Sequence, residues 1–75
     1  MNKLEIAKKI IKENYHRGDC GIFDVRGWAG DKMDTLYSNE GLQIDICNHY
    51  SYFEVFGLTE GEFSQLENFY YSLSD

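Results

Sequence analysis

Proline is absent from this sequence, so no residue forces a break in a helix, and the seven glycines are left to make the turns. No stretch approaches the roughly 20 apolar residues of a membrane span. Lysines also interrupt the apolar residues near the N-terminus, where a signal peptide would have an unbroken apolar core. We therefore expect a cytoplasmic protein, with Cys20 and Cys47 as reduced thiols.

Basic residues are scarce after residue 17. Residues 18–75 contain two of them against eleven acidic residues, a net charge of −9, whereas residues 1–17 contain five against two, a net charge of +3. The whole chain therefore carries −6. Because affinity for nucleic acid comes from neutralising phosphates, we do not expect the acidic part to bind nucleic acid directly. The basic first segment is typical of a solvated helix face.

Catalytic and cofactor-binding signatures are missing too. No Gly-x-Gly-x-x-Gly or phosphate-binding lysine motif occurs, and the glycines at 27 and 30 bracket a loop that carries Trp28, either a lid on the core or an anchor for a partner. Nothing predicts an oxyanion hole beside a cysteine. We expect neither an enzyme nor a cofactor.

One group of residues suits a structural zinc ion, which would stabilise a chain this short. It consists of His16, Cys20, Cys47 and His49. The usual two-residue gap between paired ligands is missing, however. We therefore favour idle thiols and surface histidines over a metal site.

Seventy-five residues make one domain, spanning residues 1–75, with a helix at each end. Asn2 and Glu5 predict the start of the first helix, which ends near residues 14–15. Thr59 and Glu62 have capping-box spacing and predict the start of the last helix. Helical spacing gives the two helices their apolar stripes, formed by Leu4, Ala7 and Ile11 and by Phe63, Leu66, Tyr70 and Leu73. Residues 69–71 are all aromatic, so at least one ring leaves the second stripe and either packs on the first helix or forms a self-association surface.

Between the helices, alternating residues predict four strands, over 21–26, 34–38, 42–47 and 52–56. Residues 39–41 form a three-residue connection in which Gly41 takes the left-handed position. The predicted fold is α+β, in the order α-β-β-β-β-α, an antiparallel four-stranded meander with both helices packed on one face.

The turns set the expected register of this sheet. It pairs Leu36 with Ile44, Thr35 with Asp45, Cys47 with Tyr52, Ile46 with Phe53, and Asp45 with Glu54. The face under the helices then collects Phe23, Val25, Leu36, Leu42, Ile44, Ile46, Phe53 and Val55. The opposite face collects Asp24, Tyr37, Asp45, Tyr52, Glu54 and Phe56.

The expected pairing of Asp45 with Glu54 is the main functional clue. Like charges directly opposite each other destabilise a sheet, so the pair does not serve stability. Acid–base catalysis would need a water-poor cleft, which the outer face of a sheet does not offer. A plain solvated face and a partner-binding face remain, and the expected partner-binding residues are Asp24, Asp31, Asp34, Tyr37, Asp45, Tyr52 and Glu54.

Three classes of function are compatible with these features: an inhibitor that mimics nucleic-acid charge, a small adaptor or regulatory subunit, either monomeric or homodimeric, and a small enzyme or metal-binding domain. In layout and charge, with residues 52–59 leading into an acidic helix, the chain resembles the small acidic inhibitors encoded by phages and mobile elements, anti-CRISPR proteins among them. The resemblance implies a protein partner, a basic CRISPR effector, whose access to DNA or guide RNA is blocked. We take an inhibitor of this kind as the leading hypothesis and the adaptor as its alternative.

Overall fold

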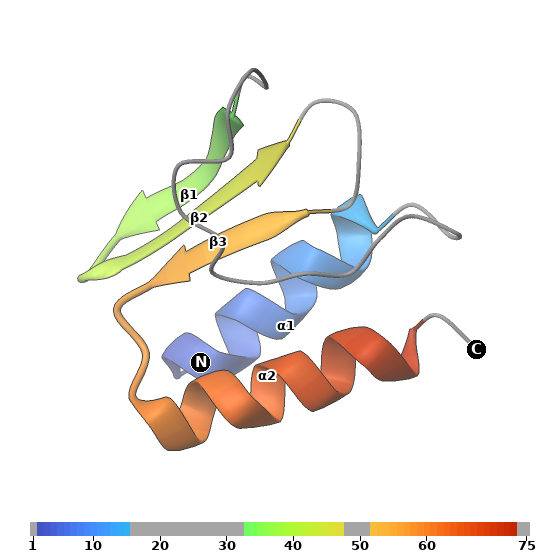
Figure 1. Cartoon of the computed structure of the whole chain (residues 1–75). Coiled ribbons are helices and arrows are strands. Elements are labelled where there is room, and N and C mark those ends of the chain that lie inside the picture. The colour runs from blue at the N-terminus through green and yellow to red at the C-terminus, as the bar shows by residue number, and fades with distance from the viewer. Residues whose placement is uncertain (1, 16–32, 48–51, 74–75) are drawn as a thin grey trace.

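The computed structural model describes residues 2–15, 33–47 and 52–73. They form two helices and three strands: α1 (Lys3–Asn14), β1 (Met33–Asn39), β2 (Leu42–Cys47), β3 (Phe53–Phe56) and α2 (Glu60–Ser72). The strands make one antiparallel sheet in the order β1-β2-β3, and both helices lie on the same side of it (Figure 1). The predicted α+β class with a helix layer on one face is confirmed, while the predicted strand over 21–26 lies outside the described residues.

Both helices begin at the caps that the sequence predicts. The Glu5 amide donates to the Asn2 side chain at 2.9 Å, so α1 starts directly after its cap. At α2 the capping box is complete, because the Glu62 amide donates to Thr59 Oγ1 at 3.2 Å and the Thr59 amide donates to Glu62 Oε1 at 3.0 Å. α1 ends at Asn14, within the predicted range.

The turn between β1 and β2 differs from the prediction. Asn39 pairs with Leu42, so the connection consists of two residues, Glu40 and Gly41, and not three. Both have positive φ, 54° and 79°, as a type I′ turn requires. The Glu40 amide also donates to the Asn39 side chain at 2.9 Å, which helps to hold a non-glycine residue in this conformation. Only the left-handed position of Gly41 was predicted correctly.

A β-bulge in β1 compensates for the shorter turn. The register shifts between Thr35 and Tyr37, so Tyr37 and not Leu36 lies opposite Ile44, while Thr35 still faces Asp45 as expected. The extra residue of a bulge changes which side chains share a face. Leu36 and Tyr37 consequently both pack against the core. The predicted pairing of Leu36 with Ile44 is therefore wrong, and so is the placement of Tyr37 on the opposite face.

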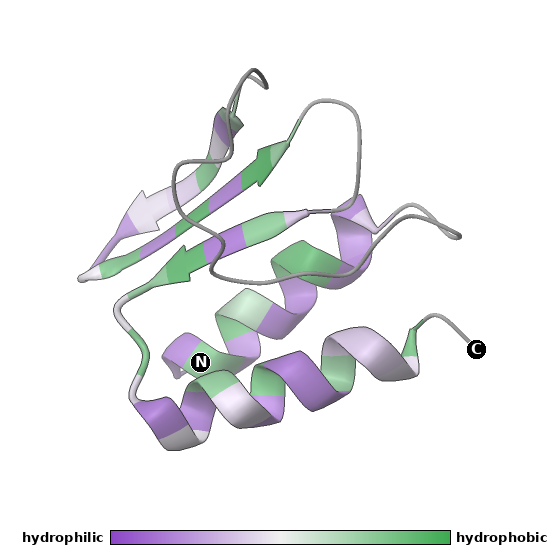
Figure 2. Ribbon diagram, in the orientation of Figure 1, coloured by the Kyte–Doolittle hydropathy of each residue, from purple (hydrophilic) through white to green (hydrophobic). Residues whose placement is uncertain are grey.

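The second hairpin follows its predicted register. Asp45 pairs with Glu54 and Ile46 with Phe53. The Cys47 amide donates to the Tyr52 carbonyl oxygen at 2.9 Å, which continues the ladder one step beyond the strands. The turn at residues 48–51 lies outside the described residues. Alternation along these two strands is visible in Figure 2 as alternating hydrophobic and hydrophilic colours.

The core lies between the sheet and the helix layer. Each helix contributes its predicted stripe, and the five predicted core residues of β2 and β3 are all buried. Two aromatic rings of this core meet edge to face, Phe53 of β3 and Tyr70 of α2, with their centroids 5.7 Å apart. The cluster of buried residues consists of Ala7, Ile11, Leu42, Ile44, Ile46, Phe53, Val55, Leu66 and Tyr70.

One end of the molecule brings the β1–β2 turn, the link from β3 to α2 and the start of α1 together. Gly57 has a φ of 102°, and a Cβ at this position would overlap the Gly41 carbonyl oxygen. The backbones of the turn and the link are thus in direct contact, which glycine permits. Lys3 Nζ donates to the Gly57 carbonyl oxygen at 3.4 Å and so ties α1 to the same point.

Candidate partner-binding surface

We use the term outer face for the side of the sheet that is turned away from the helices. Its described residues follow from strand alternation and from the register. In the middle of this face, Asp45 of β2 and Glu54 of β3 are direct cross-strand partners, and both are half-buried. The complete set is Met33, Thr35, Ser38, Gln43, Asp45, Cys47, Tyr52, Glu54 and Phe56.

One of the two paired carboxylates, that of Asp45, accepts hydrogen bonds from a neighbouring side chain. Gln43 Nε2 donates to both carboxylate oxygens of Asp45, at 3.0 and 3.3 Å. Gln43 precedes Asp45 by two residues on β2, so both side chains stand on the outer face. The amide is neutral, and it therefore orients the carboxylate without cancelling its charge.

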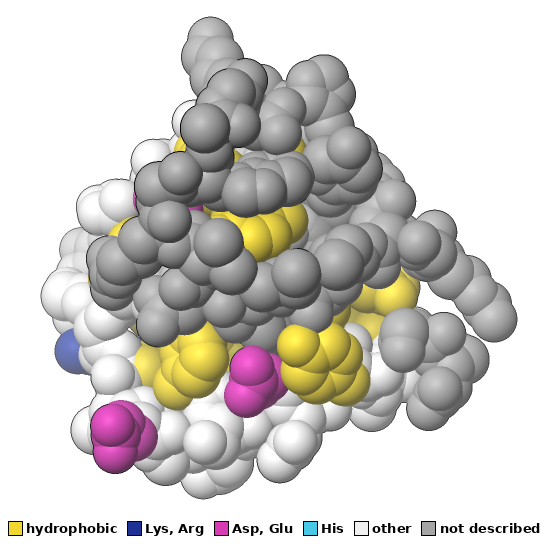
Figure 3. All heavy atoms as spheres, viewed as in Figure 1, with side chains coloured by type: hydrophobic (Ala, Val, Ile, Leu, Met, Phe, Trp, Pro, Cys, Tyr) yellow, Lys and Arg dark blue, Asp and Glu magenta, His cyan; other side chains and the backbone are white. Residues whose placement is uncertain are grey.

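Charge is sharply divided between α1 and the rest of the described chain. The described residues of the sheet and of α2, 33–47 and 52–73, contain seven carboxylates and neither lysine nor arginine. All four described lysines belong to α1, which lies on the helix side of the sheet (Figure 1). Over α2, acidic side chains lie beside hydrophobic ones (Figure 3). Within the described part of the chain, the paired carboxylates of the outer face thus meet no basic side chain of their own layer.

The structure brings together two of the seven predicted binding residues, Asp45 and Glu54. Tyr37 does not join them, because the bulge places it opposite Ile44 on the helix side. Asp34 is exposed, but it pairs with Ile46 and so also faces the helix side instead of extending the outer face. Asp24 and Asp31 lie outside the described residues.

The prediction that Tyr52 is an accessible binding residue is also wrong. Its alternation with Glu54 assigns it to the outer face, yet only 3% of the residue is exposed. Cys47, whose amide bonds to it, is 2% exposed. A tyrosine ring removes a large area from water when it is buried, and a chain this short gains from burying every ring it can. Tyr52 is therefore part of the interior at this end of the sheet, and the predicted accessible ring is not there.

Six of the nine outer-face residues were missing from the predicted site: Met33, Thr35, Ser38, Gln43, Cys47 and Phe56. Thr35 and Gln43 are exposed beside the carboxylate pair, and Phe56 is half-buried next to Glu54 on the same strand end. The period-two rule applied outward from Asp45 would have found Gln43, because it is two residues away on the same strand. The outer face is consequently more polar and less aromatic than the sequence suggested.

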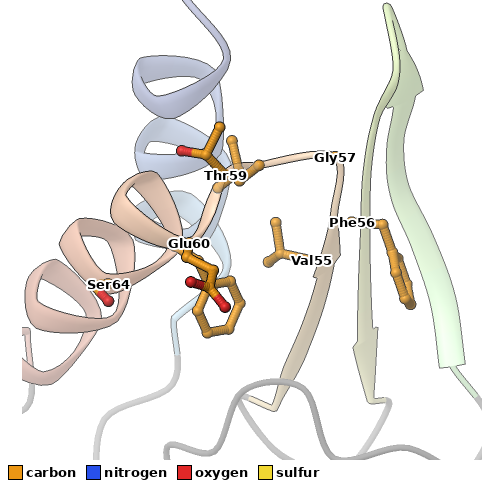
Figure 4. Close-up of a pocket in the computed structure, with 8 residues that line it drawn as sticks. Val55, Phe56, Gly57, Thr59, Glu60 and Ser64 are labelled. Atoms are coloured by element: carbon orange, nitrogen blue, oxygen red, sulfur yellow. The ribbon is translucent and has the colours of Figure 1, made fainter.

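A hollow of about 510 Å³ lies between the end of β3 and the start of α2, and we call it the β3–α2 hollow. The side chains of Val55 and Glu60 point into the space between the strand and the helix, whereas Phe56 points to the other side of the sheet (Figure 4). Its described lining residues are Val55, Phe56, Gly57, Leu58, Thr59, Glu60, Phe63 and Ser64. No local sequence pattern predicts it, since it depends on the angle between a strand and a helix.

The residues that suggested metal or thiol chemistry are largely untested by the structure. Of the four candidate zinc ligands only Cys47 is described, as a buried free thiol. Within residues 2–15, 33–47 and 52–73, no three His, Cys, Asp or Glu side chains are grouped closely enough to hold a metal ion. Neither described helix is long and apolar enough to cross a membrane.

Comparison with known proteins gave no match to any family model, any curated protein or any solved structure. A function for the chain must therefore be argued from its own residues.

Proposed function

We propose that this protein is an inhibitor that binds a basic, nucleic-acid-processing effector through its acidic outer face and so competes with DNA or RNA. Asp45 and Glu54 are the centre of the contact, with Gln43 and Thr35 beside them. The resemblance to anti-CRISPR proteins suggests a CRISPR effector as the partner. In this hypothesis the protein takes the place of a phosphate backbone in the effector's basic groove.

The observation that carries the proposal is the direct pairing of Asp45 with Glu54. Like charges opposite each other cost a sheet part of its stability. The described strands provide no lysine or arginine that would offset this cost. A basic partner would remove it, because each carboxylate can accept charge-assisted hydrogen bonds from arginine or lysine.

The division of charge between α1 and the rest of the described chain supports the same function. An acidic surface attracts a basic partner at long range and raises the rate of association. Since the described lysines lie on α1, on the other side of the sheet, they do not weaken this attraction at the contact itself. Binding should therefore fall as the salt concentration rises, since added ions screen exposed charges.

The test is a pull-down from bacterial lysate with the tagged protein, followed by binding measurements with the purified partner. We expect one basic nucleic-acid-processing protein to be retained at low salt, released at high salt and displaced by DNA or RNA. The double variant Asp45→Lys, Glu54→Lys should lose this binding. Retention of a neutral partner, indifferent to salt and to nucleic acid, would contradict the proposal.

A matched control separates the outer face from net charge. The double variant Asp34→Lys, Glu67→Lys changes the net charge by the same amount, but Asp34 lies on the helix side of β1 and Glu67 on α2. We expect it to retain most of the binding. If both double variants lose affinity equally, overall charge and not the outer face determines binding.

The alternative, a small adaptor that forms homodimers, is favoured by one observation. Tyr71 on α2 is a large hydrophobic residue with 46% of its surface exposed. Aromatic residues are enriched at protein interfaces. If the protein forms such a homodimer, Tyr71→Ser should lower the mass that light scattering measures at high protein concentration. A parent protein that has the mass of a monomer at this concentration would contradict the adaptor function.

A further inference from the structure

The β3–α2 hollow has the size of a binding site and a mixed lining. Its volume of about 510 Å³ falls within the range of roughly 300–1,000 Å³ that is typical of ligand pockets. Val55, Leu58 and Phe63 supply apolar surface, and all three belong to or pack against the core. Since the core supports them, these walls are held in place. The hollow therefore offers firmly held apolar side chains within a lining whose surface is mainly polar.

Glu60 and Ser64 give the hollow its polar side. They are four residues apart on α2, so they stand above one another on the same face of the helix. Both line the hollow, and Figure 4 shows the carboxylate of Glu60 turned into the space between α2 and β3. The hollow thus combines a carboxylate and a hydroxyl group with an apolar wall.

The start of α2 does not turn this hollow into an anion site. The capping box already occupies the amide of Glu62, and the helix begins with the two carboxylates of Glu60 and Glu62. These two charges exceed the roughly half a positive charge of a helix N-terminus. A described cation, Lys3, donates to the carbonyl oxygen of the lining residue Gly57. An incoming anion would face Glu60, whereas a cation would be attracted by it.

We propose that the β3–α2 hollow binds an arginine side chain of the partner protein. The inference rests on the proposed function, because it names one contact made by the basic partner. An arginine has an apolar stem that packs against Val55 and Leu58, and its planar guanidinium group stacks on aromatic rings such as Phe63. Its paired N–H donors match the carboxylate of Glu60 in a way that the single ammonium group of lysine does not.

The test is a nuclear magnetic resonance titration of the isolated protein at low salt with N-acetyl-L-arginine methylamide. We expect the amide signals of Glu60, Phe63 and Ser64 to shift with saturation in the millimolar range. The citrulline analogue has the same shape without the charge and should leave them unmoved. Equal shifts with both compounds, or none with the arginine compound, would overturn the proposal.

Two variants locate the effect. Glu60→Gln should weaken binding of the arginine compound by about two- to fivefold, as the loss of an exposed ion pair predicts. Glu67→Gln makes the same change on the same helix outside the lining of the hollow and should leave the affinity unchanged. Circular dichroism melting checks that both variants are folded. Equal weakening by the two would mean general attraction to α2 and would overturn the proposal.

The titration also separates this inference from the proposed function. It needs no effector, so binding of the arginine compound stands or falls independently of the outer face. If the compound binds in the hollow but the double variant Asp45→Lys, Glu54→Lys still binds the effector, only the outer-face proposal fails. If that double variant no longer binds the effector but the arginine compound does not bind to the parent protein, only the proposal for the hollow fails.

Discussion

The two sides of β3 differ sharply in burial and in charge. On the helix side, Phe53 and Val55 are 0% and 6% exposed and belong to the core. On the outer side, Glu54 faces another carboxylate, Asp45, across the ladder. Residues adjacent in sequence thus make opposite contributions: burial of apolar area stabilises the fold, and the like-charge pair opposes it.

This difference separates what β3 does for folding from the binding role that we propose for its outer side. Because side chains alternate across a sheet, the outer side of a strand can carry charge while its other side packs in the core. A like-charge pair that lowers the stability of the fold is tolerated only when the apolar burial on the other side of the sheet supplies enough stabilisation. In a small domain, where total stability is a few kcal/mol, the cost of the acidic pair is a noticeable fraction.

The largest expected effect comes from breaking the helix side. Phe53→Ala removes a fully buried ring that contacts Tyr70 and should lower the free energy of unfolding by about 3–5 kcal/mol. Denaturant unfolding followed by circular dichroism measures it. Glu54→Ala, one residue along the same strand, is the matched control and should leave stability unchanged or slightly higher. Similar losses for both variants would remove the contrast between the two sides.

The next effect concerns the point where the sheet passes into the helix layer. Gly57→Ala adds a Cβ that would overlap the Gly41 carbonyl oxygen, at a φ of 102° that side chains disfavour. We expect a loss of about 1–3 kcal/mol in the free energy of unfolding, measured by thermal and denaturant unfolding. Gly61→Ala is the control, since a Cβ there meets no atom within 4 Å. A Gly57→Ala variant as stable as the parent would show that this contact is not tight.

A smaller loss should follow from removing the cap of α2. Thr59→Ala deletes the hydroxyl that accepts the Glu62 amide and should cost about 1 kcal/mol, measured as a lower melting temperature. Thr59→Ser keeps the hydroxyl and should retain most of the stability. If the serine variant loses as much as the alanine variant, the cap is not the cause.

The smallest effect has the opposite sign and tests the outer side. Glu54→Lys places a positive charge opposite Asp45 and should raise the free energy of unfolding by about 0.2–1 kcal/mol. The gain should shrink at high salt, because the charges are partly exposed. Denaturant unfolding at two salt concentrations measures both. A loss of stability would mean that the two side chains do not interact as their pairing implies.

Sequence reasoning succeeded where a structural feature depends on nearby residues. The caps at Asn2 and Thr59 use partners three positions along the chain, so spacing alone reveals them. The second hairpin keeps strict alternation, and its pairs were predicted correctly. Of the proposed site, the pair Asp45 and Glu54 was found in this way.

Sequence reasoning failed where a structural feature depends on residues that are far apart in the chain. A three-residue and a two-residue turn both suit the residues around Gly41, and only the bulge in β1 lets the shorter turn coexist with Thr35 opposite Asp45. That choice moved Tyr37 from the outer face to the core. The burial of Tyr52 was equally out of reach, because exposure is a property of the assembled molecule.

The sequence by itself therefore determined the two helices and three strands that the structure describes, their order, the division of charge and the like-charge pair, since each follows from local spacing or composition. Only the tertiary structure decided the turn length, the faces of Tyr37 and Asp34, the burial of Tyr52 and the hollow beside α2. These depend on how strands and helices pack, and packing selects among local alternatives whose free energies differ by about 1 kcal/mol or less.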